Sequence, residues 1–389
     1  MPGYELIGKK EKEAVDEIFD KGGVLYRYGL DDKRQNIFRV DEFEREIAKK
    51  LGVRYCHSVC NGTAALKIAL LGLGVKFGDE VITQSFTFIA TVEAILELGA
   101  KPIITEIDNS LNMDPIDLER KITNKTKVII PVHMAGVPVK MDEIMETARK
   151  HNIAVLEDSA QALGGTYKKK YLGTIGAAGI YSLDIGKVIT TGEGGLLVTD
   201  NKEVYLKARE YSDHGHEINP NLPRGEDTRH YWGFNYKITE LQGAVGLAQL
   251  KKLDYILEKQ REHKKRIKDV IKNIKNIEFR EIPDLAGDTG DTLIFFVKNR
   301  EKAGQFAKLL KKDNLDVKVL PGAINWHFAG TWNHIFSDYE EYKGRDLNKV
   351  WEKSDSLLRR AIALPIMVNM DEDQINKIIN TITKISKEI

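Results

Sequence analysis

The sequence predicts an α/β fold, in which a mostly parallel, doubly wound sheet is followed by a smaller C-terminal α+β domain. Three observations support this prediction. The chain has 389 residues, enough for one large domain or two of ordinary size. Short apolar runs alternate with helical patterns through its first two-thirds, as in parallel sheets covered by helices. A long helical tract rich in Lys and Glu then separates this part from the rest, so we place a large domain at residues 1–250 and a small domain at residues 251–389.

The first part of the chain has a regular βα rhythm. Val40, Phe43, Ile47 and Leu51 recur at helical spacing and predict an amphipathic helix. In such sheets ligands bind at the carboxyl ends of the strands, so we look for chemistry in the loops that follow them. The predicted strands are 55–60, 80–83, 102–106, 128–133 and 153–157, and the predicted helices are 40–51, 64–74, 90–98, 115–121 and 142–151.

The remainder of the chain has a different pattern. Two short strands, 177–182 and 196–199, flank a glycine-rich turn. A helical tract runs from Ile238 to about Lys272. The small domain is predicted to contain strands at 277–282, 292–298 and 315–320 and helices at 302–312 and 371–385.

Composition excludes several classes of protein. The 59 Lys and Arg residues nearly balance the 58 Asp and Glu residues, and the formal net charge of +1 argues against nucleic-acid binding by bulk electrostatics. The two cysteines, Cys56 and Cys60, cannot form a disulfide framework and suit a reducing compartment. The N-terminus lacks the apolar core of a signal peptide, and no run approaches the ~18 apolar residues of a membrane span. We therefore expect a cytoplasmic protein without a membrane partner.

A carboxylate follows one of the predicted strands directly. Asp158 comes after the apolar run 153–156, at the ligand edge of the sheet. An aspartate held there can pair with a protonated ring nitrogen or with a metal ion. It can equally cap the N-terminus of a helix. From this segment alone both interpretations stay open.

A lysine lies beside a glycine-rich turn. Lys187 ends the segment SLDIGK and precedes TTGEGG. The neighbours Ile185, Val188 and Ile189 favour burial, which lowers the pKa of an amine and makes it a nucleophile for carbonyl groups. The alternative is a solvated surface lysine.

Two further segments favour a planar anionic ligand. Asn61, Gly62 and Thr63 lie between a strand and a helix, where backbone N–H groups bind anions, although an ordinary helix cap is the alternative. Phe88 follows strand 80–83 and can stack on a flat ring, whereas Phe86 fits a core position.

Together these parts predict a site for pyridoxal phosphate (PLP). A lysine forms the Schiff base, an aspartate stabilises the ring nitrogen, a helix N-terminus holds the phosphate and an aromatic ring covers the cofactor. No metal site is expected, because His214 and His216 have no further ligands near them in the sequence.

Five motifs in order carry a resemblance to a known family. They are NGTAAL (61–66), TFIAT (87–91), EDSAQALG (157–164), SLDIGKVITTGEGG (182–195) and GFNYKITELQGAVGLAQL (233–250). The chain resembles the DegT/DnrJ/EryC1/StrS sugar aminotransferases, which have the fold-type I architecture of PLP-dependent transferases. The resemblance is dense to about residue 260 and weaker beyond, where Leu364-Pro365 is similar to a late Leu-Pro turn of the family.

The resemblance implies a role for each matching residue. Lys187 binds the cofactor covalently and moves the proton during transamination. Some relatives with His at this position are dehydratases, so the lysine favours amine transfer. The family often has Ser-Phe-His-Pro-Thr-Lys where this chain has Ser-Leu-Asp-Ile-Gly-Lys. The other implied roles are ring-nitrogen pairing by Asp158, ring-hydroxyl contact by Gln161, ring stacking by Phe88, phosphate binding by Gly62, Thr63 and Ser182, and phosphate binding by Asn235 from the second subunit of a homodimer.

The opening residues 1–6 and segments 213–216 and 221–225 are similar to the subgroup that makes 8-amino-3,8-dideoxy-D-manno-octulosonate, an amino form of the lipopolysaccharide sugar Kdo. The resemblance implies 8-oxo-Kdo as acceptor and L-glutamate as donor. Amination of a nucleotide-linked keto hexose, PLP-dependent sugar dehydration and PLP binding without catalysis are the alternatives. An acceptor with a carboxylate needs a cationic partner. The candidates are Arg27, Arg34, Arg39 and Arg229, although a surface or structural role is the more common one for such arginines. His327 is a candidate for the border of the substrate pocket, and a half-buried histidine of the small domain is the alternative.

Overall fold

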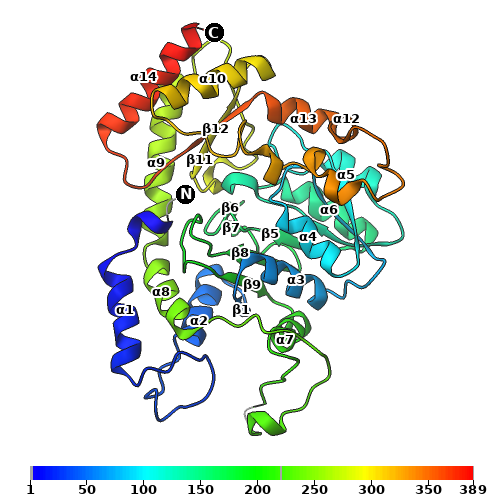
Figure 1. The fold of residues 1–389 in the computed structure, drawn as a ribbon, viewed down its shortest axis with the longest axis vertical. Helices are drawn as coiled ribbons and strands as arrows, with labels where there is room; N and C mark the ends of the chain where they lie inside the picture. Colours follow the sequence, from blue (N-terminus) through cyan, green and yellow to red (C-terminus); the bar gives the residue numbers. More distant parts are fainter. Residues whose placement is uncertain (1–2, 220, 389) are drawn as a thin grey trace.

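The computed structural model describes residues 3–219 and 221–388. A seven-stranded sheet in the order β1-β9-β8-β5-β4-β2-β3 lies at its centre (Figure 1). All pairs are parallel except those of β9, which runs antiparallel between β8 and β1. The predicted, mostly parallel α/β sheet is thus confirmed, and six strands end at the same edge. The strands are β1 (Tyr55–Val59), β2 (Glu80–Gln84), β3 (Lys101–Thr105), β4 (Thr126–Ile130), β5 (Ala154–Asp158), β8 (Ala178–Ser182) and β9 (Gly195–Thr199), and β6 (Thr166–Tyr167) and β7 (Lys170–Tyr171) form a separate hairpin.

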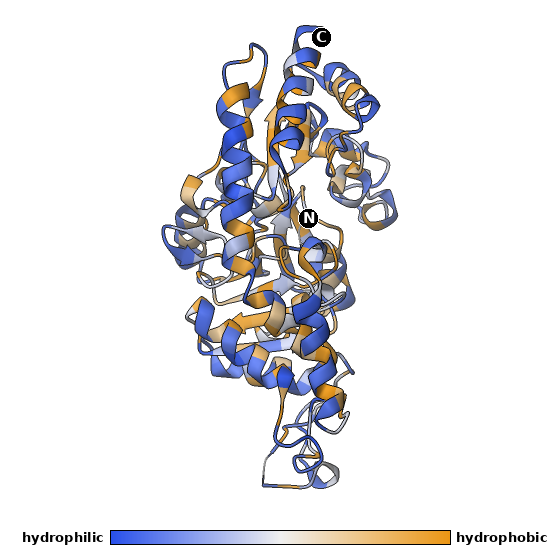
Figure 2. Cartoon of the chain, turned by 90° about the vertical axis from the view of Figure 1, so that its left-hand side faces the viewer, coloured by the Kyte–Doolittle hydropathy of each residue, from blue (hydrophilic) through white to orange (hydrophobic). Residues whose placement is uncertain are grey.

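Helices cover both faces of this sheet because its strands are apolar on both sides. Neighbouring residues of β5 point to opposite faces, so Leu156 packs with α3, α4 and α7, whereas Val155 packs with α5 and α6. The apolar strands lie between more hydrophilic helices (Figure 2). The α-helices up to residue 271 are α1 (Lys9–Asp20), α2 (Arg39–Leu51), α3 (Gly62–Gly72), α4 (Ala90–Glu97), α5 (Pro115–Lys121), α6 (Met141–His151), α7 (Lys202–Tyr211), α8 (Glu240–Leu250) and α9 (Leu253–Ile271).

A second sheet of three antiparallel strands, β10-β11-β12, packs with α9, α10 and α14 around its own core. Its third strand is not the predicted one. Residues 315–320 form no strand, although the Lys318 amide donates to the Ala363 carbonyl, because Val319 has a left-handed backbone (φ 65°) that interrupts the extended pattern. The third strand includes Leu364-Pro365, for which the family resemblance implies a turn. The elements are β10 (Glu278–Phe279), β11 (Thr292–Phe296), β12 (Ala361–Pro365), α10 (Arg300–Lys312), α11 (Asn333–Phe336), α12 (Leu347–Val350), α13 (Glu352–Arg359) and α14 (Glu372–Glu388).

Other boundaries also differ from the sequence prediction. The tract from residue 238 to 272 is two helices, since α8 ends at Leu250 and α9 begins at Leu253. Helices α1 and α7 were not predicted, although Asn201 caps α7 with its side chain.

The segment after residue 320 packs back onto the first sheet. Phe328, Trp332 and Trp351 are buried in the same core as α3 and α4. The Ala329 amide donates to the Ser85 carbonyl, just beyond β2, at 2.9 Å. Part of the predicted small domain therefore shares a core with the large one, and the boundary at residue 250 stays a prediction.

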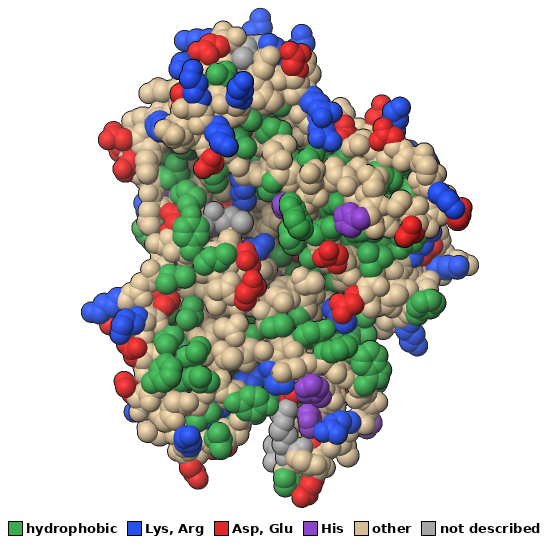
Figure 3. Space-filling model, viewed as in Figure 1, with side chains coloured by type: hydrophobic (Ala, Val, Ile, Leu, Met, Phe, Trp, Pro, Cys, Tyr) green, Lys and Arg blue, Asp and Glu red, His purple; other side chains and the backbone are tan. Residues whose placement is uncertain are grey.

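The surface carries both charge signs. Acidic and basic side chains are interspersed on the face shown in Figure 3, without a large area of one sign. This agrees with the net charge of +1. Within residues 3–219 and 221–388, no helix is long and apolar enough to cross a bilayer.

Candidate active site

A cleft of about 510 Å³ opens where the carboxyl ends of β1, β2, β4, β5 and β8 meet. Seven of the eight predicted site residues line it, together with His327. The sheet topology explains this convergence, because loops that follow parallel strands share one edge. The residues that line it include Gly62, Thr63, Phe88, Thr91, Asp158, Gln161, Ser182, Asp184, Lys187, Glu193, Lys318, Val319 and His327.

The N-terminus of α3 forms one end of the cleft. Asn61 caps this helix by accepting a hydrogen bond from the Ala64 amide at 2.8 Å. The first amides of a helix have no carbonyl partner within it, so those of Gly62 and Thr63 are available to an anion. A Cβ at Gly62 would lie 3.0 Å from the Ser182 Cβ and 3.3 Å from its Oγ. Glycine thus lets the Ser182 hydroxyl lie directly beside the helix end.

Asp158 ends β5 and is 3% exposed. The Thr91 hydroxyl donates to its Oδ2 at 2.8 Å, and the Ala160 amide donates to its Oδ1 at 3.1 Å. Burial raises the pKa of this carboxyl, and the two hydrogen bonds offset part of that rise. A turn, not a helix, follows Asp158, so the helix-cap interpretation is wrong. The carboxylate is positioned to face a cation inside the cleft.

The orientation of Gln161 is fixed by a neighbouring loop. The Ala135 amide donates to Gln161 Oε1 at 2.9 Å. Ala135 has a left-handed backbone (φ 52°), which turns its amide toward the glutamine. Because Oε1 is engaged, the NH₂ group is the part of the side chain that can donate to a ligand oxygen in the cleft.

Lys187 is half-buried in the loop after β8. Burial lowers the pKa of its amine, and the positive charge of Lys318 lowers it further against the opposing charge of Asp184. A lowered pKa gives the amine nucleophilic character. The predicted burial holds for Val188 and Ile189 but not for Ile185, which is 49% exposed.

Phe88 and His327 form the outer wall of the cleft. Their ring centroids are 5.4 Å apart, and the Trp326 ring is stacked with Phe88 at a centroid distance of 6.4 Å. Phe88 remains 43% exposed and can cover a flat ligand, whereas Phe86 is in the core, as predicted. Burial lowers the pKa of His327 to about 4.

Sequence reasoning missed several cleft residues. Thr91 lies in the TFIAT motif, but its hydrogen bond to Asp158 can be identified only in the folded structure. Glu193 lies in TTGEGG and lines the cleft beside Asp184. Lys318 reaches the cleft from the irregular segment beside β12 and carries no recognisable sequence signal.

Asn235 does not line the cleft of its own chain. It is exposed and pairs through its backbone with Asp213. The next carbonyl, that of Tyr236, accepts from the Cys60 amide at 2.7 Å, which ties this loop to the end of β1. The predicted role of Asn235 requires a second subunit and stays a prediction.

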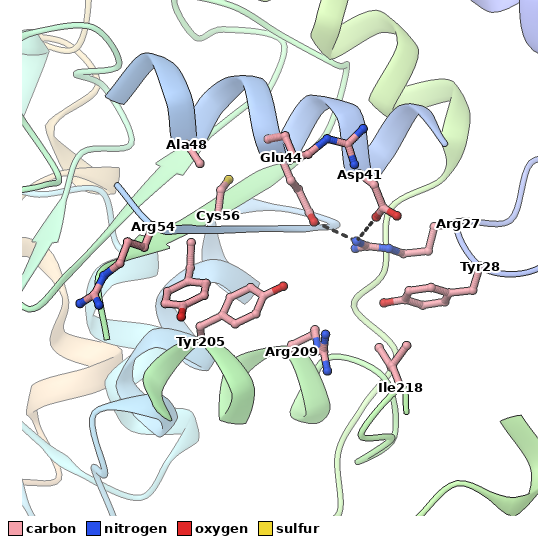
Figure 4. Close-up of a pocket in the computed structure, with 12 residues that line it drawn as sticks. Arg27, Tyr28, Asp41, Glu44, Ala48, Arg54, Cys56, Tyr205, Arg209 and Ile218 are labelled. Atoms are coloured by element: carbon pink, nitrogen blue, oxygen red, sulfur yellow. Dashed lines mark hydrogen bonds and ion pairs between the residues drawn. The ribbon is translucent and has the colours of Figure 1, made fainter. Parts of the chain in front are cut away.

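The four candidate arginines also lie outside the cleft. Arg27 is 3% exposed in a separate pocket between α2, β1 and α7, where its guanidinium pairs with Glu44 at 3.0 Å and Asp41 at 3.3 Å (Figure 4). Arg34 is buried against Glu240 and the Phe38 ring, and Arg39 pairs with Glu17 and Glu42. Arg229 is exposed and donates to His216. Within the described chain these arginines have structural partners, and none faces Lys187.

The cleft fits pyridoxal phosphate. The glycine cradle at the N-terminus of α3 suits a phosphate, since a side chain at Gly62 would fill the space beside Ser182. The buried Asp158 suits a protonated ring nitrogen, and Lys187 supplies an amine of lowered pKa in the same cleft. When bound, the cofactor supplies an electron sink for the carbon that carries the amine.

Comparison with known proteins identifies the family. The DegT/DnrJ/EryC1/StrS aminotransferase family matches residues 30–383. GDP-perosamine synthase of Escherichia coli O157:H7 is 40% identical over 284 residues, 71% of each chain, and spore coat polysaccharide biosynthesis protein SpsC of Bacillus subtilis (strain 168) is 30% identical over 98% of this chain and 96% of that protein. The structure of an aminotransferase from Psychrobacter cryohalolentis superimposes with a TM-score of 0.86 at 25% identity, covering 98% of both chains. The chain belongs to the DegT/DnrJ/EryC1/StrS aminotransferase family and is a pyridoxal phosphate-dependent sugar aminotransferase.

Proposed function

We propose that this enzyme moves an amino group from L-glutamate to the keto group of 8-oxo-Kdo, giving 8-amino-3,8-dideoxy-D-manno-octulosonate for lipopolysaccharide. One observation carries the transamination chemistry: an amine of lowered pKa, a buried carboxylate and a free helix N-terminus line the same cleft. The choice of sugar rests on the segments 1–6, 213–216 and 221–225.

Each site residue has a physical task in this proposal. Lys187 carries the proton between the substrate carbon and the cofactor, because its amine lies in the cleft and has a lowered pKa. Asp158, held by Thr91, pairs with the ring nitrogen and keeps it protonated. Phe88 covers the ring, and Gln161 donates to its hydroxyl oxygen. The phosphate ligands are Gly62, Thr63 and Ser182.

A homodimer completes the site. The loop that carries Asn235 exposes Tyr231, Trp232 and Phe234, with Trp232 72% exposed. Exposed aromatic side chains in one loop are typical of a protein interface. We propose that a second copy covers this loop and that Asn235 reaches the phosphate bound by the other subunit. A cytoplasmic location fits the free cysteines, Cys56 and Cys60.

A nucleotide-linked keto sugar is the second candidate acceptor. The observation that favours it is the similarity to two GDP-perosamine synthases. One is 40% identical over 71% of this chain, and the other is 41% identical over 55% of it. Such an acceptor brings a diphosphate instead of a sugar carboxylate.

The absorption spectrum of the holoenzyme tests the proposal in two stages. We expect L-glutamate to shift the band of the lysine-bound cofactor to that of the aminated cofactor. 8-oxo-Kdo, or in a parallel sample a GDP-linked 4-keto sugar, should then restore the first band and yield an amino sugar. The sugar that restores the band at the higher kcat/KM is the acceptor. A dehydrated product without nitrogen would contradict transamination, and an unchanged band would exclude glutamate as the donor.

A further inference from the structure

Lys318 enters the active cleft from the irregular segment beside β12 and is held there by two buried neighbours. Its Nζ donates to Asp291 Oδ2 at 2.6 Å and to the Thr292 hydroxyl at 2.7 Å. That hydroxyl in turn donates to Asp291 Oδ1 at 2.7 Å, which closes a three-membered network. Asp291 is 2% exposed, so the network fixes the ammonium at the start of β11.

Among the residues that the structure describes, one N–H of this ammonium has no partner and remains for a ligand. A lysine ammonium has three donors, and two of them are engaged by Asp291 and Thr292. The side chain of Lys318 is 12% exposed and lines the cleft that holds Lys187. An anion that enters the cleft therefore meets a positioned, desolvated cation.

The other basic groups of the cleft are not suited to this task. Lys187 is assigned to binding the cofactor and to carrying the proton. Burial lowers the pKa of His327 to about 4, so its ring is neutral near pH 7. Among the described residues that line the cleft, no arginine is present.

The backbone beside Lys318 is also unusual. Val319 lines the cleft with a left-handed backbone (φ 65°), which a β-branched residue adopts at a cost in free energy. The Lys318 amide donates to the Ala363 carbonyl at 2.8 Å, so β12 anchors the strained segment. The second sheet thus holds Lys318 in place through both its side chain and its backbone.

We propose that Lys318 binds a carboxylate of the amino donor. The inference rests on the proposed function, in which L-glutamate is that donor. A charge-assisted hydrogen bond to a carboxylate is stronger than a neutral one, and a buried setting strengthens it further. Glutamate has an α-carboxylate and a side-chain carboxylate, and the experiment distinguishes the two.

The test compares matched variants of the holoenzyme. Lys318→Met with Asp291→Asn removes the ammonium without leaving a buried carboxylate unpaired, and Lys318→Arg keeps the charge. Lys353→Met is the control, because Lys353 pairs with Asp114 and does not line the cleft. Calorimetry measures the Kd of glutarate, a dicarboxylate that cannot react. Stopped-flow absorbance measures the donor half-reaction with L-glutamate and with L-glutamine.

We expect the glutarate Kd to rise about 10-fold in the double variant, and to stay within about 3-fold of wild type in Lys318→Arg and in the control. Equal slowing with both donors places the α-carboxylate on Lys318, and slowing with glutamate alone places the side-chain carboxylate there. Unchanged binding and rates in a double variant with a normal cofactor spectrum would overturn the proposal. A wild-type enzyme that does not react with glutamate would instead refute the proposed donor.

Discussion

Two regions of the molecule bury charged groups in different ways. In the pocket of Figure 4, Arg27 pairs with Glu44, and the Ser58 amide and hydroxyl donate to the same carboxylate at 2.7 and 2.6 Å. Burial alone raises the pKa of Glu44, but the charge of Arg27, the neighbouring His57 ring and hydrogen bonds from Ser58 lower it to about 2. In the cleft, burial raises the pKa of Asp158 and lowers that of Lys187. Glu44 is thus held in its charged form by its partners, whereas Asp158 and Lys187 have charged forms that burial disfavours, as is common for groups that take part in chemistry.

The largest effect is expected for Lys187→Ala. Turnover should fall by roughly 10⁴-fold or more, because the variant loses both the covalent attachment and the proton carrier. Steady-state assays measure the loss, and circular dichroism with thermal melting checks that the fold persists. Near-normal turnover in this variant would remove the basis for treating the cleft as the reactive region.

Glu44→Gln should act on stability instead. Removing the charge leaves Arg27 buried without its main partner, which we expect to cost about 3 kcal/mol of unfolding free energy. Urea titration measures this cost. Asp41→Asn is the matched control, because Asp41 is only partly buried and its loss should cost under about 1 kcal/mol. If Glu44→Gln reduced kcat strongly at full stability, the pocket would belong to the active site.

Lowering the pH should reduce the difference in unfolding free energy between wild type and Glu44→Gln. The folded-state pKa of Glu44 is about 2, below its ordinary value of 4.5, so its contribution to stability is present above about pH 4.5 and is lost as the pH falls through about 2. The two proteins should therefore differ most near pH 7 and progressively less below pH 4. Urea titrations at pH 7, 4 and 3 check this trend, and a constant difference would contradict the lowered pKa.

The smallest effect is expected for Thr91→Val. This variant removes the donor to Asp158 Oδ2 while keeping the shape of the side chain. We expect kcat to fall about 10-fold, the loss of one hydrogen bond to a charged group. Thr91→Ser, which keeps the hydroxyl, should retain most of the activity. Equal kcat in both variants would show that Asp158 needs no support from α4.

The sequence predicted the site residues whose position follows directly from the strand that precedes them. Gly62, Asp158 and Ser182 follow or end apolar strands, and parallel strands bring such positions to one edge whatever the loops do. Lys187 lies in the loop after the last of these strands. The glycine in the motif NGTAAL also indicated an anion-binding helix end. The structure agrees, because a side chain at Gly62 would collide with Ser182.

Long-range packing decided what the sequence could not predict. Residues 315–320 have the composition of a strand, yet the left-handed Val319 turns the chain into the cleft. Arg27 was a candidate for substrate binding because it lies near family-like segments, but Glu44, which lies on α2 and is distant in the sequence, neutralises it. Lys318 was missed, since its position depends on Asp291, Thr292 and β12, all distant in the sequence.

The return of the C-terminal segment to the first sheet limits how the enzyme can exchange its ligands. A hinge motion that swung this segment away would expose the buried Trp332 and Trp351 and break the bond from the Ala329 amide to Ser85. A transaminase releases one product before it admits its second substrate. Here both must use the same entrance to the cleft beside Phe88 and His327, and that entrance has a fixed width. The width of that entrance, rather than the opening of a lid, should then set the size of the sugar that the enzyme accepts.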